Sequence, residues 1–134
     1  IIFSPQTKEQ KMFGLNEKPK TIEALDADLN QAILEGRGLE AFEQFYAEDV
    51  IMQENDAEPT VGKSANRIRE QEFFDAITEF RGAEVLSTGS GDGVTFSHWH
   101  YDFTHRDWGV RDYRQVAVRT WKNGQVVREV FQYG

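Results

Sequence analysis

Several polar residues in this chain have the side-chain types that general acid–base catalysis requires. A carboxylate such as Glu54 can remove a proton, and His98 or His100 can donate or shuttle one because an unperturbed histidine has a pKa of about 6.5. The phenol of Tyr133 can donate a hydrogen bond to a carbonyl oxygen. This combination predicts an isomerase, cyclase or hydratase site for a small, largely apolar carbonyl or hydroxyl compound. The predicted catalytic residues are Glu54, His98 and His100, and the predicted ligand-binding residues are Asn55, Asp102, Arg114, Val118, Glu129, Phe131 and Tyr133.

The same residues also have purely structural interpretations. Glu54, at a strand end, could be a capping or rim carboxylate, and the two histidines could be core residues bonded to neighbouring carboxylates. Arg114 and Glu129 could form a buried ion pair that only keeps the strand register. The spacing His98-x-His100 places two imidazoles on one strand face, but such pairs are common without a metal. We therefore predict neither a metal nor another cofactor.

The alternative is a protein without catalytic activity that binds a ligand or forms a dimer. Such a protein would have an aromatic pocket for a ligand, or would give one face of its sheet to another subunit. The sequence leaves open whether the protein is an enzyme. The residues of that alternative sheet face are Trp99, Tyr101, Phe103, Trp121 and Val130.

Hydrophobic periodicity predicts an α+β domain in the order helix, helix, strand, helix and four strands. Apolar residues first recur at three- and four-residue steps, as in amphipathic helices, and later alternate, as in strands. The Asn123-Gly124 pair is typical of a two-residue β-hairpin turn. The predicted helices cover residues 21–36, 39–47 and 62–82, and the predicted strands cover 50–56, 84–88, 94–105, 113–121 and 125–133.

The third predicted helix has a recognisable apolar stripe and a charged face. The stripe contains Ile68, Phe73, Phe74, Ile77 and Phe80. The charged face, which we predict to be solvated, contains Arg67, Arg69, Glu70 and Glu72.

The last hairpin predicts which side chains share the pocket, because paired residues point to the same face of a sheet. A two-residue turn at Asn123-Gly124 places the more apolar face of this hairpin inward. The predicted pairs on that face are Val118 with Glu129, Val116 with Phe131, and Arg114 with Tyr133.

The preceding hairpin leaves two registers open. If residues 107–109 form a three-residue loop with Gly109 left-handed, His98, His100 and Asp102 face a polar pocket. If Trp108-Gly109 is a two-residue turn, every side chain turns over and the pocket is aromatic. We favour the three-residue loop because tryptophan is a poor residue for the positive φ of a type I′ turn.

Composition excludes several classes of partner. The 134 residues carry 23 acidic and 15 basic side chains, a net charge of −8, so no basic field exists for nucleic acid or an anionic membrane. Cysteine is absent, which excludes disulfides and thiolate chemistry. No apolar run approaches the roughly 18 residues that span a bilayer. We predict a soluble, cytoplasmic protein with a flexible tail over residues 1–20 and one domain over residues 21–134.

Two segments resemble a known group of proteins. The stretch from Phe45 to Val50, followed by a polar strand end, Pro59, Gly62 and a helix, is similar to the same region of ketosteroid isomerases and SnoaL-like polyketide cyclases. The ending from Trp121 to Val127 resembles the final hairpin of their nuclear transport factor 2-like superfamily.

The resemblance implies a cone-shaped, curved antiparallel sheet that encloses a pocket with three N-terminal helices. It also implies a small-molecule ligand and a homodimer formed through the convex sheet face. In ketosteroid isomerases an aspartate is the general base, and Glu54 occupies the matching position. Their neutral acid corresponds to Val118, so the resemblance does not imply steroid isomerisation.

Overall fold

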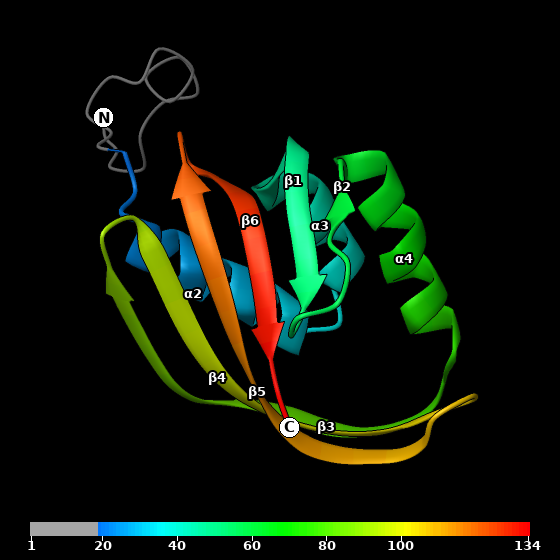
Figure 1. Ribbon diagram of the computed structural model, residues 1–134. Helices are drawn as coiled ribbons and strands as arrows, with labels where there is room; N and C mark the ends of the chain where they lie inside the picture. Colours follow the sequence, from blue (N-terminus) through cyan, green and yellow to red (C-terminus); the bar gives the residue numbers. More distant parts are fainter. Residues whose placement is uncertain (1–18) are drawn as a thin grey trace, which may run out of the picture.

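Three helices pack against a six-stranded curved sheet in the computed structural model, which describes residues 19–134 (Figure 1). This confirms the predicted α+β class. Residues 1–18 of the predicted tail lie outside the described residues. The helices are α2 (Ile22–Leu34), α3 (Gly38–Phe45) and α4 (Lys63–Asp75). The strands are β1 (Tyr46–Glu54), β2 (Thr60–Val61), β3 (Ile77–Gly91), β4 (Val94–His105), β5 (Gly109–Lys122) and β6 (Gln125–Gln132).

The strand order brings the end of the chain beside β1. The order is β2-β1-β6-β5-β4-β3, and all neighbours are antiparallel except β1 and β6, which run parallel. In that parallel pair Glu54 lies opposite Phe131. None of the helices in residues 19–134 has the length and apolar character that crossing a lipid bilayer requires.

Helix α2 begins with an N-cap and buries one face against the sheet. The hydroxyl of Thr21 accepts a hydrogen bond from the backbone N–H of Ala24 at 3.1 Å, which satisfies a free donor of the first turn. The buried face carries Leu29 together with two polar residues, Asp26 and Asn30. The apolar side of α2 and α3 joins β1, β5 and β6 in the hydrophobic core. The two predicted N-terminal helices are thus confirmed.

The predicted third helix is wrong in its second half. Helix α4 ends at Asp75, and residues 77–91 form β3, so Ile77 and Phe80 lie in a strand. Strand β3 pairs with β4 along its whole length, and its register shifts at three places. Each shift breaks the two-residue alternation that marks a strand. Pairing with β4 therefore overrides a spacing that is typical of a helix.

A bulge in the last hairpin changes which residues face inward. Next to the turn, Trp121 pairs with Val126, but Thr120 pairs with Arg128, so Val127 is an extra residue in β6. Because side chains alternate, one extra residue exchanges the faces of the rest of the strand. Glu129 therefore pairs with Arg119. The predicted pairing with Val118 is wrong.

The hairpin between β4 and β5 has a three-residue loop, as predicted, but it begins one residue earlier than residues 107–109. The loop contains residues 106–108, and Gly109 follows it with a left-handed φ of 77°. His98 pairs with Val116 and His100 with Arg114, so these four residues share a face. That face is the outer one, opposite the helices, because the inward side chains of β4 include Trp99 and Phe103, which are buried.

Candidate functional site

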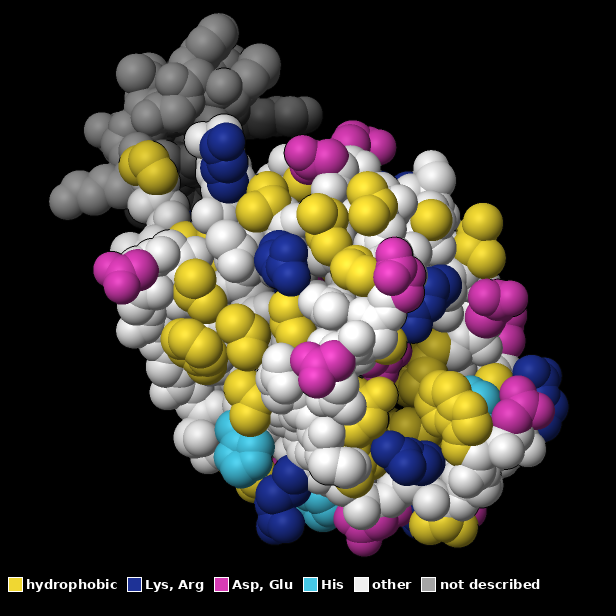
Figure 2. All heavy atoms as spheres, viewed as in Figure 1, with side chains coloured by type: hydrophobic (Ala, Val, Ile, Leu, Met, Phe, Trp, Pro, Cys, Tyr) yellow, Lys and Arg dark blue, Asp and Glu magenta, His cyan; other side chains and the backbone are white. Residues whose placement is uncertain are grey.

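A cavity of about 710 Å³ opens between α4 and the inner face of the sheet (Figure 2). Figure 2 shows a hollow with hydrophobic side chains inside it and charged side chains around its edge. Phe42, Phe73 and Phe131 supply apolar wall. The volume lies in the range of roughly 300–1,000 Å³ that is typical of small-molecule sites.

Five of the predicted site residues do not line this cavity. His98, His100, Asp102, Arg114 and Val118 lie on the outer face of the sheet. The prediction that they face the pocket is wrong, because the bulge in β6 places the opposite face of β5 inward. The inner face is aromatic: Tyr101 lines the cavity and stacks on the buried Trp99 at 5.1 Å between ring centroids. The alternative sheet face proposed for a second subunit is therefore mostly interior.

Of the other five predicted site residues, three line the cavity and two, Asn55 and Tyr133, lie beside Glu54 without lining the cavity. The three lining residues are Glu54, Glu129 and Phe131. Tyr133 donates its hydroxyl proton to Oε1 of Glu54 at 2.8 Å and its backbone N–H to Oδ1 of Asn55 at 2.9 Å. The chain terminus is thereby attached to the end of β1.

His100 belongs to an ion-pair cluster on the outer face. Its Nε2 lies 2.6 Å from Oδ1 of Asp112, and its Nδ1 lies 3.4 Å from Oε1 of Glu84. The hydrogen bond to Asp112, followed by that to Glu84, raises the pKa of His100 above 6.5. The folded protein therefore stabilises the imidazolium form of His100 relative to the unfolded chain.

We expect the NMR titration of His100 to report this cluster and not the cavity. The midpoint of His100 should lie above 6.5 in the wild type and should fall in Asp112→Asn, because the amide cannot compensate the imidazolium charge. In Glu54→Gln, which changes a cavity residue, the midpoint should not move. A midpoint that responds to Glu54→Gln and ignores Asp112→Asn would contradict this assignment.

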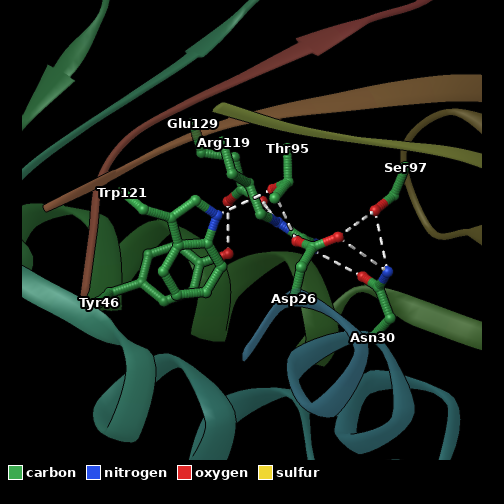
Figure 3. A network of polar contacts seen from close by, with 8 residues as sticks. All are labelled: Asp26, Asn30, Tyr46, Thr95, Ser97, Arg119, Trp121 and Glu129. Atoms are coloured by element: carbon green, nitrogen blue, oxygen red, sulfur yellow. Dashed lines mark hydrogen bonds and ion pairs between the residues drawn. The ribbon is translucent and has the colours of Figure 1, made fainter. Parts of the chain in front are cut away.

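A buried polar network joins α2 to the floor of the cavity (Figure 3). At its centre Arg119 donates from Nη1 to Oδ1 of Asp26 at 2.7 Å and to Oδ1 of Asn30 at 2.6 Å. From Nε it donates to Oε2 of Glu129 at 2.7 Å. Arg119 is 2% exposed, so both ion pairs are removed from water.

The acids of this network have further partners. Thr95 and Ser97 donate to the two oxygens of Asp26 at 2.9 and 3.0 Å. Tyr46 donates to Oε1 of Glu129 at 2.6 Å, so each oxygen of this carboxylate has one protein donor. Burial, followed by the charge of Glu129, raises the pKa of Tyr46 well above its ordinary value. Glu129 is thus a fixed carboxylate beside the cavity.

Glu70 is a functional candidate that the sequence prediction missed. We expected it on a solvated face, but it lines the cavity, while Ile68 of the predicted apolar stripe is 62% exposed. Asn66, Glu70 and Phe73 follow each other at steps of four and three and all line the cavity. This stripe, which mixes polar and apolar residues, defines the inward side of α4.

The cavity favours the protonated form of the Glu70 carboxyl group. Burial in the cavity, followed by the charges of Glu129 and Glu54, raises its pKa to about 8. Among residues 19–134 no side chain donates a hydrogen bond to it. A neutral carboxylic acid in such surroundings can donate a hydrogen bond or a proton to a bound molecule.

Glu54 stands at the edge of the cavity with two partners. Arg69 of α4 pairs with its Oε2 at 3.1 Å, and Tyr133 donates to its Oε1. Burial, followed by the hydrogen bond to Glu54, raises the pKa of Tyr133 to about 12, so Tyr133 remains a proton-bearing donor. Glu54 and Glu70 thus place an ion-paired carboxyl group and a carboxyl group with a raised pKa in one cavity.

The imidazole in the cavity wall is His105, which sequence reasoning did not select. Its ring stacks on Trp108 with a centroid distance of 3.7 Å, and its Nδ1 accepts the backbone N–H of Asp107 at 3.1 Å. Phe73 packs nearby at 6.1 Å from the His105 ring centre. His105, Trp108 and Phe73 thus form an aromatic part of the cavity wall. The position of His105 at the end of β4 was the signal in the sequence that could have indicated it. Among residues 19–134 no three His, Cys, Asp or Glu side chains are grouped as metal ligands.

Comparison with known proteins identifies the fold. No family model matches the chain, and no curated protein matches its sequence. A Mesorhizobium loti protein assigned as a SnoaL-like polyketide cyclase has a TM-score of 0.76 and 23% identity, over 84% of this chain and 98% of that one.

Two further solved structures give the same result. A Xanthomonas campestris protein assigned as a polyketide cyclase has a TM-score of 0.69 and 18% identity, over 84% of this chain and 89% of that one. A nuclear transport factor 2-like protein of unknown function from Burkholderia pseudomallei has a TM-score of 0.71 and 14% identity, over 84% of this chain and 89% of that one. The chain thus has the nuclear transport factor 2-like fold.

Proposed function

We propose that the cavity binds a small, largely apolar carbonyl compound and catalyses proton transfer on it, with Glu54 as general base and Glu70 as general acid. The observation that carries this proposal is the presence of Glu70, without a hydrogen-bond donor from residues 19–134, in the same cavity as the ion-paired Glu54. Two carboxyl groups held in different protonation states are the pattern that acid–base catalysis requires.

The chemistry follows from the two groups. The carboxylate of Glu54 removes a proton from the carbon next to the carbonyl, and the C–H electron pair becomes the C=C bond of an enol. The carbonyl π electrons move to oxygen, which receives the proton of Glu70 or its hydrogen bond. If a C=C bond is conjugated with the enol, Glu54 returns its proton to the far carbon while the enol O–H proton returns to Glu70, which gives an isomer. If the enol carbon instead bonds to a second carbonyl carbon, the π electrons of that carbonyl move to its oxygen, which takes the proton from Glu54, and the enol O–H proton returns to Glu70, which gives a ring. Each outcome leaves the atoms balanced without a cofactor.

The neighbouring folds support this class of reaction. Two of the solved structures of this fold belong to proteins assigned as polyketide cyclases. Their identities to this chain are 23% and 18%, so the support extends to the class and not to a substrate.

The activity can be tested by hydrogen exchange with 2-tetralone, a fused-ring ketone with acidic protons next to its carbonyl. In D₂O near pH 7, we expect the protein to accelerate the loss of those proton signals in the NMR spectrum above the buffer rate. Saturation-transfer NMR on the same sample measures binding. Binding without accelerated exchange would favour the non-catalytic ligand-binding module, and failure to bind would contradict the proposed ligand class.

A further inference from the structure

A buried amide faces the cavity without a protein partner. Gln115 of β5 is 8% exposed and lines the cavity, yet within residues 19–134 its side chain makes no hydrogen bond. The Gln115 amide is open to the cavity, so its donor and acceptor are available to a bound molecule. The acid–base pair described above does not use Gln115.

Two residues next to Gln115 also carry hydrogen-bond donors without a partner among the described residues. Trp99, its register partner on β4, has a buried indole N–H with no acceptor among the described residues. Tyr101 lies diagonally across from Gln115, lines the cavity, and has a hydroxyl without a partner in residues 19–134. Burial raises the pKa of Tyr101 far above its ordinary value, so this hydroxyl keeps its proton. Ala117, the next inward residue of β5, is small and leaves room beside the amide.

The charges of the cavity select against an anionic ligand. Each arginine in its wall already has a carboxylate partner: Arg69 pairs with Glu54, Arg106 with Asp107, and Arg119 with Asp26 and Glu129. No lysine among residues 19–134 lines the cavity. A carboxylate or phosphate on the ligand would therefore meet Glu54, Glu70 and Glu129 without a free cation.

We infer that the cavity takes an uncharged compound with two oxygen functions, one bound at Glu70 and the other at the Gln115 amide, and that Gln115 determines this specificity. The position of the first oxygen rests on the proposed function. An amide offers both a donor and an acceptor, so the second oxygen is a hydroxyl or a carbonyl. The apolar part of the ligand fills the space between these points, against the aromatic wall.

Titration calorimetry with 2-tetralone and the hydroxy-2-tetralones tests this inference. We expect at least one hydroxyl position to raise the affinity of the wild type about three- to tenfold, as one net hydrogen bond does. In Gln115→Leu this gain should disappear, whereas 2-tetralone itself should bind within about twofold of the wild type. Gln132→Leu, which changes an exposed glutamine on β6, should retain the full gain.

Several results would overturn the inference. These are equal gains in wild type and Gln115→Leu, no gain at any hydroxyl position, no binding of any tetralone, or tighter binding of 2-aminotetralin than of 2-tetralone. Gln115→Met, which keeps the side-chain length, replaces the leucine variant if that variant does not fold. Because binding is measured without turnover, a retained hydroxyl preference with no hydrogen exchange would reject the proposed catalysis alone.

Discussion

Replacing Arg119 with methionine is expected to lower the free energy of unfolding by about 3–5 kcal/mol. The guanidinium compensates two carboxylates, those of Asp26 and Glu129, which are 3% and 1% exposed. Removing it leaves two buried acids that must either take up protons or remain charged in an apolar interior. Methionine fills a similar volume, so the loss reports the charge and not a cavity.

Urea denaturation followed by circular dichroism measures this effect, and an exposed ion pair provides the control. Arg67 contacts Glu43 at 2.6 and 2.8 Å, but the two side chains are 45% and 49% exposed. Arg67→Met should therefore cost less than about 1 kcal/mol. Similar losses in the two variants would contradict the view that the network of α2 and β5 is a principal stabilising element.

Replacing Glu54 with glutamine is expected to slow the hydrogen exchange of 2-tetralone about 100- to 10,000-fold. The amide has nearly the shape of the carboxylate and can still accept the hydrogen bond of Tyr133, but it cannot accept the substrate proton. The affinity for 2-tetralone should change little, because the apolar wall is intact. The rate is measured by NMR in D₂O, as for the wild type.

Glu58 offers a matched control for this variant. It lies in the loop that follows β1 and is exposed. Glu58→Gln removes the same charge from the same region and should leave the exchange rate unchanged. If Glu54→Gln exchanges within about threefold of the wild type, Glu54 is a rim carboxylate and the base must be sought elsewhere.

Much of the fold was predictable because local patterns agreed with the final packing. The periodicity of the first two helices and the Asn123-Gly124 turn correctly located α2, α3 and the last hairpin. Two predictions, the extent of the third helix and the register of the last hairpin, were wrong for the same physical reason. Register shifts along β3 and the extra Val127 in β6 are consequences of strand pairing over long distances, and no local pattern encodes them.

The site was predictable only where it did not depend on those bulges. Glu54 was expected at the pocket from the resemblance, and Phe131 from the face of the last hairpin. Both line the cavity, where the parallel pairing of β1 with β6 places them opposite each other. His98 and His100 were misplaced because a one-residue bulge exchanges the faces of a strand. Glu70 was missed because the charged face of a helix is usually solvated. In α4 the face that carries Glu70 turns toward the cavity instead.

The raised pKa of Glu70 also makes stability depend on pH. Below pH 4.5 the side chain is protonated in both states, and between 4.5 and about 8 the folded state binds the proton that the unfolded chain has lost. The free energy of unfolding should therefore fall as pH rises through this window, by an amount on the order of a few kcal/mol, and Glu70→Gln should remove this dependence.

The protonation of Glu70 is the most direct test of the account. Carbon-13 NMR of the glutamate carboxyl groups, with the Glu70 signal assigned by its loss in Glu70→Gln, gives the titration midpoint of this residue. We expect a midpoint of about 8, which leaves a neutral acid in the cavity at neutral pH. A midpoint near 4.5 would show an ordinary solvated carboxylate and would contradict the role of Glu70 as general acid.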